Sequence, residues 1–379
     1  MQKKLIALAV AGLASTAAFA QSNVTIYGVA DATFDTYKAS GSAASATDVG
    51  SKNRVTSNSS YIGFKGVEDL GNGLKAAFQL ENGVNFDNGA AGAWNNRDSY
   101  VGLVGGFGTV VAGNVTGPTR ALGAKFDVNA GATGVGANTA LIGKIGGGQG
   151  ASHFDQRLNN AIAYISPSFS GFSAVAGYTT GYTASGLVAK EASVANPAAG
   201  NTGMTLGLNY DNGPIYVGYA YTAVKGEDNG TGVVAATYKK AENNRLGAMY
   251  NFGQGSVGLL WDNTKFTAVA GGTDVKNTVY YLSGKYNVTP AGKIIAQYGI
   301  AKNMTATAAD DGAKHLVIGY EHSLSKRTVV KAVYSAITNN AGATYDFLYG
   351  AAASTATAAA SAAAGADPKS ISVGVRHSF

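Results

Sequence analysis

The clearest feature of the chain is a strict alternation of apolar and polar residues in short segments. In the last segment, Ile371, Val373, Val375 and His377 share one face, and serine, glycine and arginine stand between them. Alternation with a period of two is typical of a β-strand with one apolar face. We therefore expect a final strand that ends at Phe379 and carries its apolar side chains on one side.

The same alternation recurs in four further stretches. In each of them a large apolar or aromatic residue recurs on one face, and mostly small or polar residues occupy the other. Repeated segments of this kind, about ten residues long, are typical of strands that cross a membrane with one face toward lipid and the other toward the barrel interior. The stretches are residues 205–210, 245–252, 279–286 and 293–298.

Connections between the strands alternate between short and long. The short ones are rich in glycine, asparagine and serine, which suits tight hairpins, and span residues 71–73, 105–108, 166–171, 211–214, 252–255, 289–292 and 323–327. The long ones span residues 36–58, 82–96, 114–156, 181–203, 225–243, 265–276, 303–313 and 338–369. These fifteen connections predict sixteen strands. An even number of strands places both termini of the barrel-forming chain on the periplasmic side, where the turns are short.

Composition supports a membrane barrel over the alternatives. Only 13% of the residues are charged, against roughly 25% in an ordinary soluble domain. Beyond the first twenty residues, no window offers the about 18 strongly apolar residues of a membrane helix. Residues 351–366 are nearly all alanine, serine and threonine, and we expect a loop that can hold helical turns there. The predicted fold is an all-β, transmembrane, antiparallel up-and-down β-barrel, closed because an open edge in lipid would leave backbone groups unpaired.

The first twenty residues have a different character. Lys3 and Lys4 precede an apolar stretch at 5–13, and Ala-Phe-Ala at 18–20 has the form of a cleavage site. We expect residues 1–20 to be a signal peptide and residues 21–379 to form the barrel. Without the two lysines the formal charge falls from +6 to +4, and the basic residues are scattered, so no nucleic-acid partner is expected. The chain contains no cysteine, so barrel closure and not disulfides must hold it together.

Six stretches together resemble the general diffusion porins of Gram-negative bacteria, in particular their betaproteobacterial and neisserial branch. They are NVTIYGVADATF at 23–34, IGFKGVEDLGNGLKAAFQLE at 62–81, NRDSYVGLVGGFGTVVAG at 96–113, RLNNAIAYISPSFSGF at 157–172, SLSKRT at 323–328 and SVGVRHSF at 372–379. They occur in the expected order across nearly the whole predicted barrel. The resemblance implies a homotrimer in which one loop latches onto the neighbouring subunit. It also implies that the terminal aromatic Phe379 is read by the outer-membrane assembly machinery.

The resemblance further implies that the third external loop, about residues 114–156, folds into the barrel and narrows it. Its length and many glycines support this independently. The loop contributes Arg120, Lys125 and Asp127 to the expected constriction, and Arg97 matches an arginine of the family motif. Strand parity, counted along each segment, places further cations on the inner wall. They are Lys65, Lys75, Arg157, Arg245, Lys285, Lys293, Lys331 and Arg376, facing the acids Asp31, Glu81, Asp262 and Glu321.

Two positions depart from the family pattern. Tyr61 stands where the family usually has an arginine before the IGFKG segment, and Asn114 stands where an arginine often follows the strand that ends in TVVAG. In relatives both arginines help to line the positive wall of the constriction. The strength of the anion preference is therefore left open by the sequence.

The expected function is a water-filled channel for small hydrophilic solutes and ions, with modest anion preference. Many of the inward charges could instead only keep the lumen wet or pair with neighbouring acids. A substrate-selective channel, a surface adhesin and a barrel enzyme remain alternatives. The four histidines show no metal-ligand spacing and no cofactor is expected, although residues 310–312, Asp-Asp-Gly, could hold calcium in an exposed loop. Outer-membrane lipid and lipopolysaccharide are the expected surroundings.

Overall fold

The computed structural model describes residues 23–43, 47–87, 94–145, 153–181, 201–225, 238–268, 271–305, 310–347 and 362–379, and within them nearly every segment is a strand. The predicted signal peptide and residues 351–361 lie outside the described residues. The first nine strands are β1 Asn23–Ser40, β2 Val49–Ser57, β3 Tyr61–Gly71, β4 Leu74–Gly83, β5 Ser99–Gly105, β6 Gly108–Thr116, β7 Arg157–Ile165, β8 Phe172–Thr179 and β9 Thr202–Asn212. The others are β10 Ile215–Lys225, β11 Tyr238–Asn251, β12 Gly255–Ala268, β13 Val275–Asn287, β14 Gly292–Ala301, β15 Ala313–Ser323, β16 Thr328–Asn339 and β17 Asp367–Ser378.

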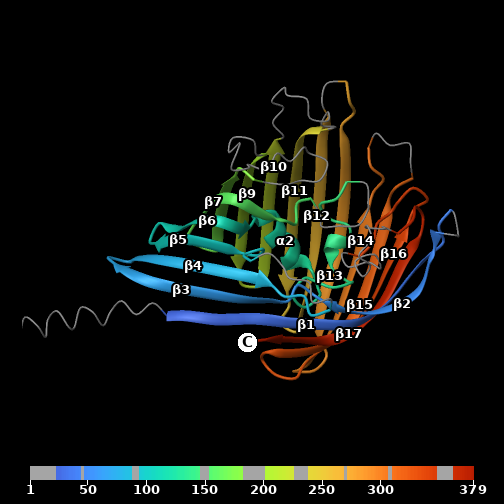
Figure 1. Cartoon of the computed structure of the whole chain (residues 1–379), viewed down its shortest axis with the longest axis horizontal. Coiled ribbons are helices and arrows are strands. Elements are labelled where there is room, and N and C mark those ends of the chain that lie inside the picture. The colour runs from blue at the N-terminus through green and yellow to red at the C-terminus, as the bar shows by residue number, and fades with distance from the viewer. Residues whose placement is uncertain are drawn as a thin grey trace, which may run out of the picture.

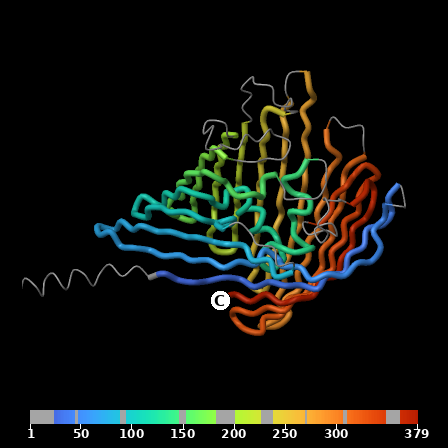
Figure 2. Tube along the Cα trace, viewed as in Figure 1, coloured from blue at the N-terminus to red at the C-terminus, as the bar shows by residue number. Residues whose placement is uncertain are grey.

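The sheet closes on itself through β1. One edge of β1 pairs with β17, and its other edge pairs first with β3 and then with β2. Since β2 and β3 follow each other along the same edge, the seventeen described segments make sixteen barrel strands, all antiparallel to their neighbours (Figures 1 and 2). The predicted fold class and strand number are confirmed. Closure satisfies the backbone groups that an open sheet would expose to lipid.

The two faces of the wall are inverted relative to a soluble protein. In β17, Ile371 is 55% exposed on the outside, whereas Ser372 is 4% exposed on the inside. The same alternation holds in β11, where Leu246 and Tyr250 point outward and Arg245 points inward. An apolar outer face suits lipid and a polar inner face suits water. The parity predicted from the sequence is therefore the parity of the barrel.

Strands β1 and β2 extend further toward the external end of the barrel than the sequence predicted. Residues 36–58 were expected to be a loop, but β1 runs to Ser40 and β2 begins at Val49. In this extension Asp35 pairs in register with Arg54, and Thr56 donates a 2.6 Å hydrogen bond to Asp35. Polar inward residues thus satisfy one another beyond the apolar band, which lets the sheet extend into a region whose composition resembles a loop.

Helix is scarce. The described residues contain the helix α2, Pro118–Phe126, and the 3-10 turn η2, Asn138–Ala140, both in the connection between β6 and β7. Within the described parts of the chain, no helix is both long and apolar enough to cross a membrane. Figure 1 shows α2 inside the barrel, alongside the inner wall. The predicted inward fold of the third external loop is confirmed, and its described residues 117–145 and 153–156 contain no strand.

Candidate channel constriction

Helix α2 packs against the wall through one face. Pro118, Leu122 and Phe126 recur every four residues, so they lie on the same side of the helix. Each sits over a glycine of a neighbouring strand, in the order Gly207 in β9, Gly218 in β10 and Gly247 in β11. A Cβ atom on Gly207 would lie 2.6 Å from Pro118, and one on Gly218 would lie 2.6 Å from Leu122. These glycines therefore form a smooth seat for the helix, a role that the sequence reasoning did not predict.

Arg245 joins both ends of the loop to the wall. Its guanidinium is fully buried and donates to Asp155 at 2.8 Å, to Asp262 at 2.7 Å and to the carbonyl of Thr119 at 2.7 Å. Asp262 also accepts from the backbone N–H of Gly143 at 2.9 Å. Parity correctly turned Arg245 inward, but the loop covers it, so its charge is enclosed between loop and wall and does not face water.

Asp127 organises the middle of the loop. Its carboxylate accepts hydrogen bonds from the backbone N–H groups of Asn129 at 2.8 Å and Asn138 at 2.7 Å. The side chain is 2% exposed, and burial raises the pKa of Asp127 to about 6, although these hydrogen bonds oppose the shift. Asp127 therefore holds a turn of the loop together and does not face the open channel.

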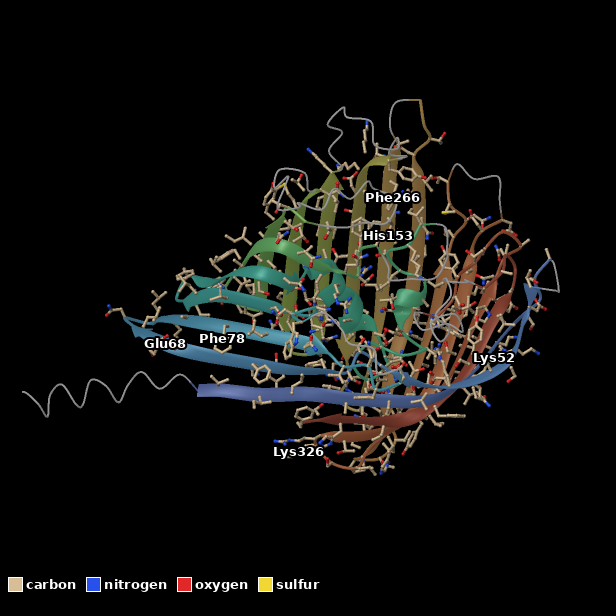
Figure 3. All side chains as sticks on the ribbon, in the orientation of Figure 1. Lys52, Glu68, Phe78, His153, Phe266 and Lys326 are labelled. Carbon is tan, nitrogen blue, oxygen red and sulfur yellow. The ribbon has the colours of Figure 1, made fainter. Side chains whose placement is uncertain are left out.

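The loop continues through the interior to β14 and β15. Gln297 in β14 donates to the carbonyl of Gly136 at 2.6 Å, and the backbone N–H of Ala130 donates to Glu321 in β15 at 2.8 Å. At the returning end, the ring of His153 lies 5.1 Å from that of Phe266 in β12, both marked in Figure 3. The loop therefore connects β9–β12 with β14 and β15 inside the barrel, and polar atoms gather around it (Figure 3).

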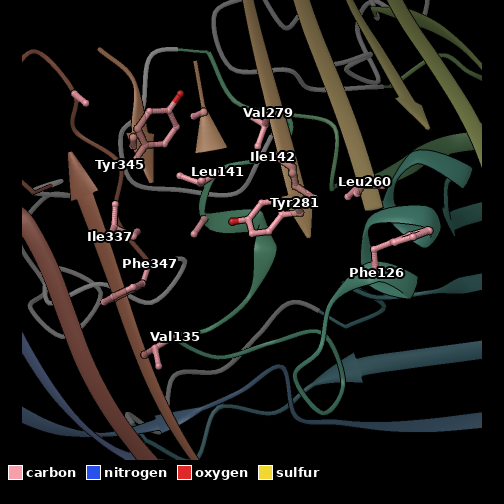
Figure 4. Close-up of a cluster of buried hydrophobic side chains, with 14 of the residues drawn as sticks. Phe126, Val135, Leu141, Ile142, Leu260, Val279, Tyr281, Ile337, Tyr345 and Phe347 are labelled. Atoms are coloured by element: carbon pink, nitrogen blue, oxygen red, sulfur yellow. The ribbon is translucent and has the colours of Figure 1, made fainter. Parts of the chain in front are cut away.

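A second external segment also folds inward. Tyr345 and Phe347, from the connection between β16 and β17, join Leu141 and Ile142 of the constriction loop in one buried apolar cluster (Figure 4). Asn277 in β13 donates a 2.7 Å hydrogen bond to the hydroxyl of Tyr345. The two loops thus support each other on the external side. The two aromatics within an alanine-rich connection were the available signal in the sequence.

Three arginines lie close together near the two ends of the constriction loop. Arg97 pairs with Glu81 at 3.3 Å, Arg157 pairs with Asp98 at 3.0 Å, and Arg120 donates to the backbone carbonyl of Asp155. Burial lowers the pKa of Arg97 and of Arg120, and repulsion by Arg157 lowers both further. Such mutual repulsion requires the three guanidinium groups to be neighbours. We call Arg97, Arg120 and Arg157 the arginine cluster.

The two departures from the family pattern both contact this cluster. The guanidinium of Arg97 lies 4.3 Å from the ring centroid of Tyr61, and the side-chain amide of Asn114 donates to the backbone carbonyl of Arg97 at 2.8 Å. A cation over an aromatic face is attracted by the electrons of the ring. Tyr61 and Asn114 therefore hold Arg97 in place, whereas the resemblance implies an arginine at each of their own positions.

The remaining cations fall into two groups. Four are paired, because Lys125 contacts Asp211 at 3.1 Å, Lys293 contacts Glu321 at 2.8 Å, and both Lys331 and Arg376 contact Asp31, at 2.7 and 3.2 Å. Lys65, Lys75 and Lys285 make no ion pair with any residue that the structure describes. Lys65 lies 4.8 Å from the ring centroid of Tyr27.

Two of the histidines, and the aspartates of the segment 310–312 that could hold calcium or be an exposed loop, are hydrogen-bonded to other protein groups. His315 is buried in the wall and bonded to Tyr281 at 2.7 Å and Ser335 at 2.8 Å, while His377 bonds to Thr328 at 2.9 Å. Asp310 accepts from Asn340, and Asp311 accepts from the backbone of Met304. Among the described residues, no group of three histidine, aspartate or glutamate side chains is arranged to hold a metal ion.

Comparison with known proteins places this arrangement in a family. Residues 7–342 match the family described as Gram-negative porin. The chain belongs to the Gram-negative porins. It is 33% identical to outer membrane porin protein 32 of Delftia acidovorans, with all of both chains covered. It is 31% identical to the major outer membrane protein P.IB of Neisseria lactamica, covering 86% of this chain and 91% of that protein.

A solved structure agrees with this placement. The anion-selective porin from Comamonas acidovorans superposes with a TM-score of 0.77 at 30% identity, covering 95% of this chain and 100% of that chain. OmpT of Vibrio cholerae, at 15% identity and a TM-score of 0.63, shares the fold. The suspected resemblance is confirmed. The chain is an outer-membrane porin, and members of this family are channels and not enzymes.

Proposed function

We propose that this porin is a general diffusion channel for small hydrophilic solutes and ions, with a modest preference for anions. The observation that carries the proposal is the burial of every carboxylate of the constriction loop. The loop has two acids, Asp127 and Asp155, which are 2% and 3% exposed and are bonded within the loop or to Arg245. Neither carboxylate is left to attract a passing cation.

Positive charge dominates the inner surfaces around the constriction loop. The arginine cluster and the unpaired Lys65, Lys75 and Lys285 supply cations to the interior, where low-dielectric walls extend the reach of a charge. Glu81 and Asp98 offset part of this charge through their pairs with Arg97 and Arg157. Anions then meet a lower entry barrier than cations, over a range of about a Debye length. The offset keeps the preference modest.

A reversal-potential measurement tests the sign. The folded protein is inserted into a planar bilayer that separates two KCl concentrations, and the zero-current potential gives the ratio of chloride to potassium permeability. A ratio above one is expected. A chloride-to-potassium permeability ratio below one would contradict the proposal. In a separate liposome-swelling assay, permeation rates that differ strongly between sugars of equal size would favour a substrate-selective channel.

Three partners complete the proposal. The porin resemblance supports a homotrimer, and Trp94, 75% exposed between β4 and β5, is available on a connecting loop for contact with a neighbouring subunit. Phe379, paired through backbone bonds with Gly28, supplies the terminal aromatic for the assembly machinery. Outer-membrane lipid and lipopolysaccharide surround the apolar wall. Gel mobility before and after boiling tests the trimer, and the mass of the exported protein tests removal of residues 1–20.

A further inference from the structure

The outer face of strands β11–β14 carries a shallow apolar groove. Its volume is about 340 Å³, and its lining includes Leu259, Trp261, Tyr280, Leu282 and Tyr298. Leu259 and Leu282 are among the most exposed leucines of the wall. These side chains belong to the outward set of their strands, so the groove opens toward lipid and not toward the channel. Its apolar lining and shallow depth suit an acyl chain.

Three lysines lie at the external side of this groove, on three adjacent strands. Lys276 belongs to β13, Lys302 directly follows β14, and Lys314 belongs to β15. All three are exposed and lie on the outward face of the wall, which they share with Tyr280, Ile300 and Leu316. Lys314 pairs in register with Ile300, and the backbone N–H of Lys302 donates to the carbonyl of Thr278 at 2.9 Å. The three lysines therefore occupy one patch, which we call the lysine triad.

The triad directly adjoins the groove. The ammonium group of Lys302 lies 5.6 Å from the ring centroid of Tyr280, which lines the groove. Lysine stems cover apolar surface while the charged end reaches toward polar headgroups. The geometry therefore places positive charge at the position where the headgroup of a lipid would lie, if its acyl chain filled the groove.

No carboxylate among the described residues forms an ion pair with the triad. The nearby Asp274 is paired with Lys265 at 2.9 Å, and Asp310 accepts from the side chain of Asn340 at 2.6 Å. The triad makes no ion pair with the described part of the chain, in contrast to Lys293 and Lys331 of the inner wall. Clustered lysines at the edge of a bilayer attract anionic headgroups.

We propose that the groove and the lysine triad bind one phosphorylated lipid of the outer leaflet, with an acyl chain along Tyr280 and Tyr298 and the phosphate on Lys276, Lys302 and Lys314. The occupant is lipopolysaccharide, whose lipid portion combines several acyl chains with phosphates. The site rests on the membrane location of the porin but not on conduction. Loss of the site would leave ion passage intact, so the two proposals can fail separately.

The chain offers a built-in probe, because it has only two tryptophans, Trp94 and Trp261, and Trp261 lines the groove. In a Trp94→Phe background, folded full-length protein is placed in vesicles of dibrominated phosphatidylcholine, whose bromine atoms quench Trp261. Diphosphoryl lipid A is then titrated. Displacement of the brominated chain restores fluorescence, and the lipid fraction at half recovery measures binding.

The combined change Lys276→Gln, Lys302→Gln and Lys314→Gln should raise this lipid fraction at least tenfold. The matched control is Lys38→Gln, Lys225→Gln and Lys369→Gln, which removes the same charge from exposed external positions on β1, β10 and β17 and should change it less than twofold. Heat-shifted gel mobility and single-channel conductance confirm that each variant is folded and conducts.

Four outcomes would overturn the proposal. Equal shifts in the triad variant and the control would show diffuse attraction and not a site. Equal recovery with dephosphorylated lipid A would remove the role of phosphate. Equal recovery with phosphatidylglycerol would assign the site to another lipid. Absence of initial quenching would show that Trp261 is covered, as by a second copy of the chain.

Discussion

The guanidinium of Arg97 lies over the ring of Tyr61, 4.3 Å from its centroid, while the same arginine pairs with Glu81. A tyrosine at this position attracts the cation through its ring electrons and adds no charge of its own. Tyr61 therefore holds Arg97 in place at a position where the resemblance implies a further arginine. This relationship sets the first expectation for selectivity.

Replacing Tyr61→Arg should raise the ratio of chloride to potassium permeability by about two- to fivefold, because a unit charge a few ångströms from a passing ion contributes up to about 1 kcal/mol in water. Reversal potentials under a KCl gradient measure the ratio. Tyr61→Phe keeps the ring under Arg97 and should leave the ratio unchanged. An equal effect of both substitutions would show that the hydroxyl, and not the charge, matters.

Neutralising Lys65→Gln should lower the same ratio, because Lys65 is an inward cation without an ion pair among the described residues. Lys326→Gln, on the exposed turn between β15 and β16 in Figure 3, removes the same charge outside the channel. It should have little effect at 0.1 M salt or above, where the Debye length is about 10 Å or less. Equal ratios in the two variants would place Lys65 outside the ion path.

Removing one partner of the buried arginine should loosen the constriction loop. Asp155→Asn leaves Arg245 with Asp262 as its sole acidic partner, and breaking a buried ion pair costs about 3–5 kcal/mol. We expect a lower temperature of heat-induced unfolding and noisier single-channel currents. Asp211→Asn breaks the exposed pair with Lys125 and should cost at most about 1 kcal/mol. If Asp155→Asn and Asp211→Asn lower the unfolding temperature equally, Arg245 does not anchor the loop.

Filling the seat of α2 should displace the helix. In Gly247→Ala the new methyl group would overlap the ring of Phe126, and overpacking of this kind costs about 1–3 kcal/mol. Single-channel conductance should change together with stability, because the helix narrows the channel. Gly284→Ala in β13, whose nearest neighbour would be 3.5 Å away, is the control and should preserve both. Unchanged conductance in the Gly247 variant would argue against the seat.

Stability should fall as the pH rises from about 4 to about 6, through the titration of Asp127. Burial raises the pKa of this carboxyl from 3.8 to about 6, so its contribution is complete below the unfolded pKa and lost above the folded one. The shift corresponds to about 3 kcal/mol. Denaturant midpoints across this range measure it, and Asp127→Asn should flatten the profile. A variant that retains the full slope would assign it to other groups.

Much of the fold follows from short-range pattern. The alternation from Ile371 to Val375 fixes which face meets lipid, and turn residues fix the strand count, because each strand needs only local information to be recognised. The same parity places Arg245 on the inner face. It does not reveal that the loop covers Arg245, since what packs on an inner face depends on residues far along the chain.

The constriction was harder to predict for the same reason. Glycines in strands ordinarily weaken them, so Gly207, Gly218 and Gly247 acquire meaning only once α2 lies above them. The contact of Tyr61 and Asn114 with Arg97 likewise joins residues from three separate segments. The continuation of β1 and β2 beyond residue 36 was hidden because their polar residues satisfy each other across strands.

The pairing of β1 with β17 has a consequence for assembly. Their register joins Val29 to Ser378, positions almost the whole chain apart, and Gly28 and Phe379 exchange two backbone hydrogen bonds of 3.1 Å. This seam combines the most distant partners in the sequence, so forming it carries the largest loop-closure entropy. We expect the β1–β17 pairing to form last during folding, after the third external loop has entered the barrel. If this pairing forms last, the barrel interior closes at the same time as the last unpaired strand edges disappear.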